Sequence, residues 1–146
     1  MILLREEREL TFKDESKHTY HPFLVRDKVT ALSIIFSYEP GNYGGDDCVE
    51  RIVGAYLKVG RDIDLEDAKK SLPVNNLLTL SLDGPKGMIG NAHRHKLEQK
   101  IYISEQKAEY GFNPVPILPG LYRVCISSHC IASPRLKYKL LVESIE

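Results

Sequence analysis

Alternation of apolar and polar residues with a period of two is the feature that most constrains the fold of this chain. The pattern is clearest at residues 135–142, where Leu136, Tyr138 and Leu140 are separated by basic side chains. The same alternation occurs in further segments at 31–38, 78–83, 100–104 and 122–127. Because successive side chains of a β-strand point to opposite faces of a sheet, this pattern predicts strands with one buried face.

Turn residues separate these segments from one another and from three weaker strand patterns at 9–12, 20–25 and 88–94. Pro-Gly or Gly-Pro pairs stand at several of the junctions, and such pairs are typical of tight chain reversals. With 146 residues, 42% of them hydrophobic, the chain is long enough for one core and too short for two. We therefore predict a single all-β domain over residues 1–146, an antiparallel β-sandwich of jelly-roll type with about eight strands.

Residues 41–73 interrupt this regular pattern and are too numerous for a hairpin loop. The segment carries seven Asp or Glu residues and five Lys or Arg residues. One stretch within it, 64–72, is typical of a short helix, because Asp64 can cap its first turn and Lys69 and Lys70 suit its last turn. We interpret 41–73 as an insertion with one short helix, which is either an excursion with elements of its own or a mobile flap.

Charge and cysteine content exclude several classes of protein. Lys and Arg together number 20, as do Asp and Glu, whereas proteins that bind nucleic acid through its phosphates usually carry a basic excess. The N-terminal sequence does not resemble a signal peptide, and no apolar run approaches the roughly 18 residues of a membrane span. We therefore expect a cytoplasmic protein without membrane contact, in which Cys48, Cys125 and Cys130 are free thiols.

His93 and His95 head the first of two groups of candidate site residues. At positions i and i+2 of a strand, two imidazoles lie on one face about 6.5–7 Å apart, a workable spacing for two ligands of one metal ion. His18 or His129 could supply a third ligand. The sequence leaves two interpretations open: a zinc-type site, which would suit a metal-dependent hydrolase with a bound water, and surface histidines without a ligand. Apart from such a divalent metal, no cofactor is expected.

The second group would suit a carbohydrate- or anion-binding domain. Tyr110, Phe112 and Asn113 lie in one expected loop, where aromatic and amide groups at outward positions can contact a sugar. Arg135 and Lys137 lie on the outward face of the last strand, where they either contact an anion or protect an edge strand from pairing with another sheet. Common catalytic motifs such as Gly-x-Ser-x-Gly, the Walker loop and His-Glu-x-x-His are absent from the sequence.

Three stretches of the chain resemble a known family. They are the strand and turn Leu80-Ser-Leu-Asp-Gly-Pro-Lys-Gly, the segment Gly90-Asn-Ala-His-Arg-His, and the stretch from Ala108 to Val124, which contains an Ile-Leu-Pro-Gly turn. They are similar to a β-sandwich, itself like the pre-peptidase C-terminal domain, that precedes the catalytic domain of PHP-type metal-dependent phosphoesterases. The resemblance implies a β-sandwich fold and an accessory role.

This resemblance covers most of residues 20–143 apart from 41–73, and Tyr122 stands where the family usually has Trp. The chain stops at Glu146 without the phosphoesterase domain, so no catalytic residue is carried over. We predict a non-catalytic accessory or interaction module whose partner is a separately encoded phosphoesterase. The metal-dependent hydrolase and the carbohydrate- or anion-binding domain stay as alternatives, and the oligomeric state is left open.

Overall fold

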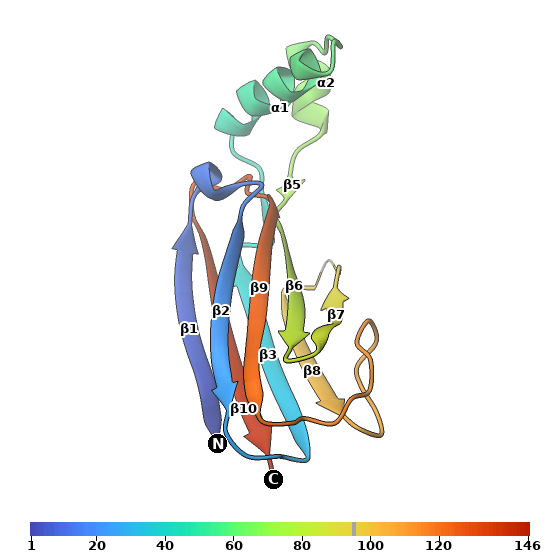
Figure 1. Cartoon of the computed structure of the whole chain (residues 1–146). Helices are drawn as coiled ribbons and strands as arrows, with labels where there is room; N and C mark the ends of the chain where they lie inside the picture. The colour runs from blue at the N-terminus through green and yellow to red at the C-terminus, as the bar shows by residue number, and fades with distance from the viewer. Residues whose placement is uncertain (95) are drawn as a thin grey trace.

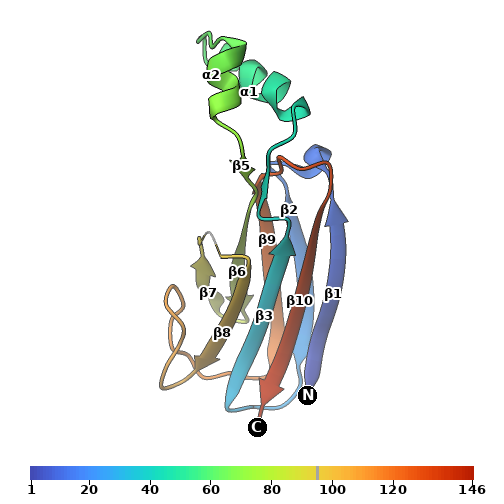
Figure 2. The same ribbon diagram turned by 180° about the vertical axis from the view of Figure 1, so that it is seen from behind.

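Eight long strands form two four-stranded antiparallel sheets that pack face to face (Figure 1, Figure 2). The structure is a computed structural model that describes residues 1–94 and 96–146. Sheet A contains, in spatial order, β1 (Ile2–Leu10), β10 (Leu136–Ile145), β3 (Ala31–Glu39) and β8 (Glu98–Ser104). Sheet B contains β2 (His18–Val25), β9 (Gly120–Cys130), β6 (Leu77–Gly84) and β7 (Gly87–Ala92). The predicted antiparallel β-sandwich is confirmed.

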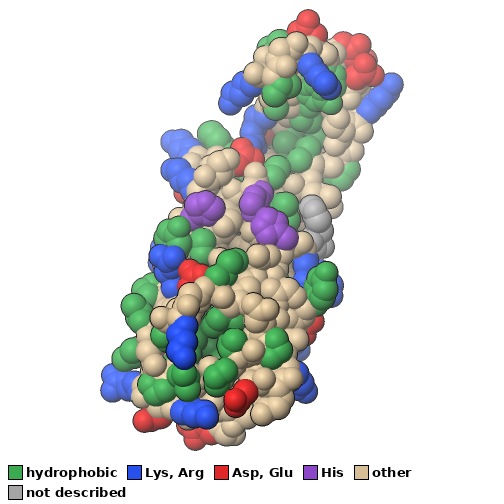
Figure 3. Space-filling model, turned by 45° about the vertical axis from the view of Figure 1, so that its right-hand side comes forward, with side chains coloured by type: hydrophobic (Ala, Val, Ile, Leu, Met, Phe, Trp, Pro, Cys, Tyr) green, Lys and Arg blue, Asp and Glu red, His purple; other side chains and the backbone are tan. Residues whose placement is uncertain are grey.

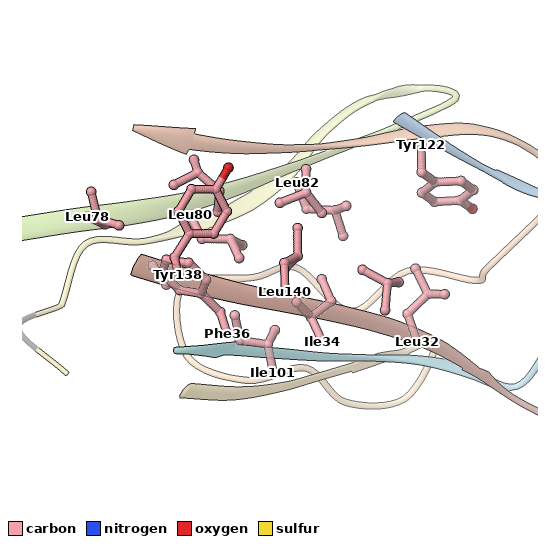
Figure 4. Packing of buried hydrophobic residues seen from close by; sticks show 14 of the residues in the cluster. Leu32, Ile34, Phe36, Leu78, Leu80, Leu82, Ile101, Tyr122, Tyr138 and Leu140 are labelled. Carbon is pink, nitrogen blue, oxygen red and sulfur yellow. The ribbon is translucent and has the colours of Figure 1, made fainter. Parts of the chain in front are cut away.

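Apolar side chains at alternate positions of both sheets meet in one core between them (Figure 4). Ile34 and Phe36 come from β3 in sheet A, Leu80 and Leu82 come from β6 in sheet B, and all four are fully buried in the same cluster. Fully burying one such side chain contributes about 1.5–3 kcal/mol to folding. The alternation seen in the sequence is therefore what holds the two sheets together.

Between β3 and β6 the chain leaves the sandwich and forms what we call the helical arm, residues 42–75 (Figure 1). The short strands β4 (Asn42–Tyr43) and β5 (Val74–Asn75) pair at its base, and α1 (Asp47–Lys58) and α2 (Leu65–Lys70) form its end. A 3-10 turn, η1 (Phe12–Asp14), joins β1 to β2 at the same end of the sandwich. The insertion is thus an excursion with elements of its own.

The short helix predicted in the insertion is present as α2, but the insertion also contains a second helix, α1, that was not predicted. Asp64 caps α2 as expected, since its carboxylate accepts a hydrogen bond from the Asp67 backbone N–H over 2.8 Å. In α1 the N-cap residue Asp46 forms no such bond, and Gly54 lies mid-helix, where Gly is about 0.8–1.0 kcal/mol less favourable than Ala. The sequence does contain a helical signal for α1, because apolar residues recur three or four positions apart. These residues are Val49, Ile52, Val53 and Tyr56. Within the described residues, no helix is long and apolar enough to span a membrane.

Asn76 anchors both ends of the helical arm to the sandwich. Its buried side-chain NH2 group donates to the Pro40 carbonyl and to the Ser133 hydroxyl, each over 2.9 Å. Its side-chain oxygen accepts from the Ala132 backbone N–H at 2.7 Å, and its backbone N–H donates to the Gly41 carbonyl at 2.9 Å. One residue therefore ties together the chain entering the arm, the chain leaving it and the loop between β9 and β10.

A buried histidine on β2 crosses the core. Nε2 of His21 is 2.7 Å from the hydroxyl of Tyr138 on β10, so this contact joins sheet B to sheet A. Burial is the main effect on the pKa of His21 and lowers it, with the charge of Glu6 raising it and that of Arg8 lowering it. Burial has the opposite effect on Tyr138, whose pKa it raises to about 12. Both side chains are therefore uncharged in the folded protein at pH 7.

Replacing Asn76 with Ala should destabilise the protein, because the Pro40 carbonyl and the Ala132 N–H lose their partner. Each buried polar group left unsatisfied costs about 1–3 kcal/mol, so we expect Asn76→Ala to lower the free energy of unfolding in urea by about 2–4 kcal/mol. Asn75→Ala, at the exposed neighbouring position, is the matched control and should change it by less than about 0.5 kcal/mol. Equal effects of the two substitutions would contradict the anchoring role.

Lowering the pH should destabilise the protein through His21. The unfolded chain binds a proton at the ordinary histidine pKa of about 6.5, whereas the folded protein binds it only at lower pH. The free energy of unfolding should therefore fall as the pH drops below about 6.5, by at most about 1.4 kcal/mol per pH unit from this residue. Urea denaturation of the wild type and of His21→Gln from about pH 7.5 to about pH 5 should give the shallower dependence for the variant. An identical dependence would assign it to other groups.

Candidate functional site

Three of the four histidines that the sequence singles out lie at one end of the outer face of sheet B. His18 begins β2, His129 is the penultimate residue of β9, and His93 follows the end of β7. Histidine side chains gather on this face (Figure 3). Because β7 ends at Ala92, the expectation that His93 lies on a strand was wrong. His95 lies outside the described residues.

Strand pairing brings these histidines together from distant parts of the sequence. The ring centres of His93 and His129 are 5.1 Å apart. Nε2 of His129 is 2.8 Å from the Thr79 hydroxyl, and Nδ1 of His18 is 2.8 Å from the Ser127 hydroxyl. Ser127 of β9 pairs with His18 on one side and with Thr79 on the other. The result is a row of imidazole and hydroxyl groups across three strands.

The described residues do not form a three-ligand metal site. Within residues 1–94 and 96–146, no group of three or more His, Cys, Asp or Glu side chains is placed to hold a metal ion. His93 and His129 are adjacent, but Nε2 of His129 is engaged with Thr79, and a catalytic zinc ion takes three protein ligands. The predicted zinc site, one of whose expected ligands lies outside the described residues, and the hydrolase built on it therefore stay predictions.

Burial lowers the pKa of His129, and positive charge on His93 and His18 lowers it further. The neighbouring imidazoles matter because a proton bound by one of them disfavours a proton on the next. The His129 ring is therefore neutral at pH 7. It acts there as the hydrogen-bond partner of Thr79 and not as a cation.

The predicted ligand contacts in the loop before β9 do not share one surface. The expectation that Phe112 is exposed was wrong, because Phe112 is buried and belongs to the core. Tyr110 is almost fully exposed, and Arg94 lies over its ring and donates a hydrogen bond to its backbone carbonyl. Asn113 is also exposed, while its backbone N–H donates to the Ile89 carbonyl over 2.9 Å. The loop is thus held against β7, with Tyr110 and Asn113 open to solvent.

The basic side chains on the outer face of β10 do not protect an edge strand, and they do not form a patch of unpaired positive charge. β10 lies between β1 and β3, so the edge-strand interpretation was wrong. Nε of Arg135 is 3.4 Å from a carboxylate oxygen of Glu9, and Nζ of Lys137 is 3.7 Å from one of Glu7. Acids of β1 therefore balance these two cations, which argues against an anion site at Arg135 and Lys137.

The outer face of sheet B carries exposed apolar side chains that the sequence analysis missed. Tyr20 and Leu24 of β2 are each 51% exposed, Leu121 of β9 is 64% exposed and Met88 of β7 is 59% exposed. Leu24 and Leu121 are direct partners across the β2–β9 pair. We call these four side chains the apolar patch. The sequence contains a signal for this patch. Residues 22–25 are all apolar, so one strand carries apolar side chains on both of its faces.

One ion pair lies in the middle of this face. A guanidinium nitrogen of Arg123 is 3.0 Å from a carboxylate oxygen of Asp83, and its guanidinium carbon is 4.3 Å from the centre of the Tyr20 ring. The outer face of sheet A differs in kind, since Glu7 and Glu9 of β1 face basic residues of β10 across the pair. Sheet A thus presents a charged surface, and sheet B presents a largely uncharged one.

A cavity of about 340 Å³ lies at the β6–β7 turn, whereas His93 follows the other end of β7. The β6–β7 turn and the loop before β9 form its walls, with Pro85, Met88, Val115, Pro119 and Tyr122 among the lining residues. Met88, one of the four side chains of the apolar patch, also lines this cavity. The wall of the cavity is mainly apolar. The volume of the cavity lies at the lower end of the range for small-molecule and side-chain pockets.

Comparison with known proteins does not place the chain in a family. No family model matches it, and no curated protein matches it. Among solved structures, PliG of Aeromonas hydrophila, a periplasmic inhibitor of g-type lysozyme, has a TM-score of 0.43 and 6% identity over 98% of this chain and 86% of that one. A protein of Sulfurospirillum deleyianum has a TM-score of 0.34 and 8% identity over 96% of this chain and 98% of that one. At such scores neither likeness supports a conclusion about function.

Removing the imidazole of His93 should raise the pKa of His129, because a positive charge on His93 opposes protonation of its neighbour. Titrating the histidine ring resonances by NMR in the wild type and in His93→Gln measures the shift. Lys100→Gln, on the outer face of sheet A, is a control that removes a positive charge elsewhere and should leave His129 unchanged. A His129 pKa that stays constant or falls in His93→Gln would contradict the coupling.

Proposed function

We propose that this chain is a non-catalytic interaction module that binds a protein partner through the outer face of sheet B. The observation that carries the proposal is the difference between the two outer faces of the sandwich. On sheet A, acids of β1 and bases of β10 pair across the strands, which favours a hydrated surface. On sheet B, the apolar patch is exposed and contains the neighbouring side chains of Leu24 and Leu121, and contiguous exposed apolar groups are typical of interaction sites.

The composition of the face supports a protein as the partner. Tyr and Arg are enriched among the residues that dominate the energetics of protein interfaces, and Tyr20 and Arg123 stack on each other here. Because Arg123 is already paired with Asp83, a partner that covers it would bury a neutralised charge and not a bare one. The cavity beside Met88 offers a pocket for one anchoring side chain. We therefore expect a partner surface that is mainly apolar and uncharged, with an aromatic or aliphatic anchor.

Carbohydrate binding at the same face is a second candidate function. The His18–Ser127 and Thr79–His129 hydrogen bonds place imidazole and hydroxyl groups beside an exposed aromatic ring, with the His18 and Tyr20 ring centres 6.4 Å apart. Such groups suit contacts to sugar hydroxyls. The exposed side chains of the apolar patch favour the protein partner, because burying them is worth about 25 cal/mol per Å².

Other expectations from the sequence stay predictions. The order β1-β10-β3-β8 in one sheet and β2-β9-β6-β7 in the other supports the jelly-roll type, since β1 to β2, β2 to β3 and β9 to β10 each cross between the sheets. A separately encoded phosphoesterase as the partner and a cytoplasmic location rest on the sequence alone.

Peptides selected from a phage-displayed random library against the whole chain provide a defined probe of the proposed face. Bound peptides should perturb amide NMR signals of β2, β9 and β6 and should not perturb those of β1 and β10. We expect Leu121→Glu to weaken their binding at least about tenfold, because it places a charge in the middle of the contact. Lys139→Glu, an exposed substitution on sheet A, is the matched control and should leave the affinity unchanged.

Two results would contradict the proposal. One is a set of peptides that perturb sheet A or the helical arm while Leu121→Glu binds them normally. The other is a failure to select any peptide together with saturable binding of an oligosaccharide such as chitohexaose that shifts His18 and Ser127. That second result would favour the carbohydrate-binding candidate, because those residues belong to the polar row and not to the apolar patch.

A further inference from the structure

The helical arm is incompletely packed as a single copy. Its two helices bury three side chains, those of Cys48, Val49 and Ala68. Leu57 of α1 and Leu65 of α2 are more than half exposed, and hydrophobic side chains are visible on the surface of the arm (Figure 3). A pair of short helices gains most of its stability from packing an apolar face, so this arm has apolar surface left to bury.

Gly54 marks the place on α1 where another helix could approach closely. A Cβ atom at Gly54 would meet nothing within 4 Å, so no contact inside the described chain requires glycine there. Glycine inside a helix is nevertheless unfavourable by about 0.5–1 kcal/mol relative to Ala. Gly54 lies at the edge of a groove of about 470 Å³ between α1 and the sandwich, which Lys58 also lines and which Phe12 and Cys130 line from the sandwich side. The distance between two packed helices depends on the side chains at their crossing, and Gly permits a short one.

Charged residues are arranged symmetrically about Gly54. Asp47 and Glu50 precede it by seven and four positions, and Lys58 and Arg61 follow it by four and seven. The spacing of three and four places Asp47, Glu50, Gly54 and Lys58 on one side of α1. Arg61 lies beyond the helix end, after Gly60 turns the chain with a φ of 72°, and its backbone N–H donates to the Tyr56 carbonyl over 2.9 Å. The face is thus acidic at its N-terminal end and basic at its C-terminal end.

The middle charges of this face are not used within the chain. Among the described residues, neither Glu50 nor Lys58 takes part in a salt bridge, and both are exposed. By contrast, on α2 Lys69 is 3.8 Å from Glu66 and Lys70 is 3.4 Å from Asp67. The arm therefore pairs these α2 charges internally. On α1, Asp47 accepts a hydrogen bond from the Tyr43 hydroxyl over 2.6 Å, whereas Glu50 and Lys58 form no ion pair among the described residues.

We propose that two copies of this chain associate through their α1 helices, which cross antiparallel with Gly54 facing Gly54 at the two-fold axis. Glu50 then faces Lys58 of the second copy, and Asp47 faces Arg61 of the second copy, twice over by symmetry. A parallel crossing would instead set acid against acid and base against base, which is unfavourable. Leu57, one turn from the axis, supplies apolar contact beside the crossing.

One helix crossing is a small interface, below the roughly 1,200 Å² typical of stable complexes, so a weak, concentration-dependent dimer is expected. Sedimentation equilibrium of the whole chain from about 10 µM to about 1 mM covers this range. Each single charge reversal, Glu50→Lys or Lys58→Glu, should weaken dimerisation at least about tenfold, because it places like charges together at two symmetric contacts. The double reversal should restore the dimer.

Gly54→Leu provides an independent measurement. It should raise the thermal stability of the arm, because Leu is a better helix former than Gly, while it blocks the close crossing and weakens the dimer. The paired reversal of Glu66→Lys with Lys69→Glu on α2 is the matched control and should not change dimerisation. Leu121→Glu, on the face proposed for partner binding, should also leave the dimer intact, so failure of either proposal can be recognised separately.

A monomer at every concentration would overturn this proposal. So would a dimer that resists both single reversals, or one that the double reversal does not restore, because each result removes the antiparallel pairing about Gly54. A dimer lost in Leu121→Glu and retained in Gly54→Leu would place the self-association on sheet B instead. Circular dichroism of each variant establishes that α1 is folded before its association is compared.

Discussion

The hydrogen bonds of Asn76 are the constraint on which the rest of this architecture depends. A sandwich is stable when its strands follow one another through short loops, and here the chain leaves between β3 and β6 to build the helical arm. Asn76 closes that excursion, because its side chain joins Pro40, where the chain departs, to Ala132 and Ser133 in the β9–β10 loop. The core can therefore form beneath the arm as though the insertion were a short connection.

The two sheets present different outer surfaces to solvent. Their inner faces are alike, since both supply alternate apolar side chains to the core. Their outer faces differ because β1 brings acids beside the bases of β10, whereas β2 brings Tyr20 and Leu24 beside Leu121. The zero net charge of the chain conceals this division. Partner binding on sheet B and self-association through α1 would use separate parts of the molecule.

Polar groups inside and around sheet B are placed by strand pairing. His21 lies in the core against Tyr138, while His18, three positions earlier on the same strand, lies on the outer face against Ser127. An odd separation along a strand places two side chains on opposite faces, so one histidine is structural and the other belongs to a surface row. Residue type alone does not distinguish them, and only their positions in the sheet do.

By itself the sequence determined most of the long strands, the antiparallel sandwich, the position of the insertion, the α2 cap at Asp64 and the free thiols. These follow from local chemistry: side-chain alternation, turn residues and hydrogen bonds between near neighbours. The strand expected at 9–12 was misplaced, because β1 spans Ile2–Leu10 and a 3-10 turn follows it. Only the tertiary structure decided that β10 is a central strand, that Phe112 is buried and that His93 lies beside His129. Those facts depend on which strands become neighbours, and pairing between residues as distant as His18 and Ser127 leaves no periodic signal along the chain.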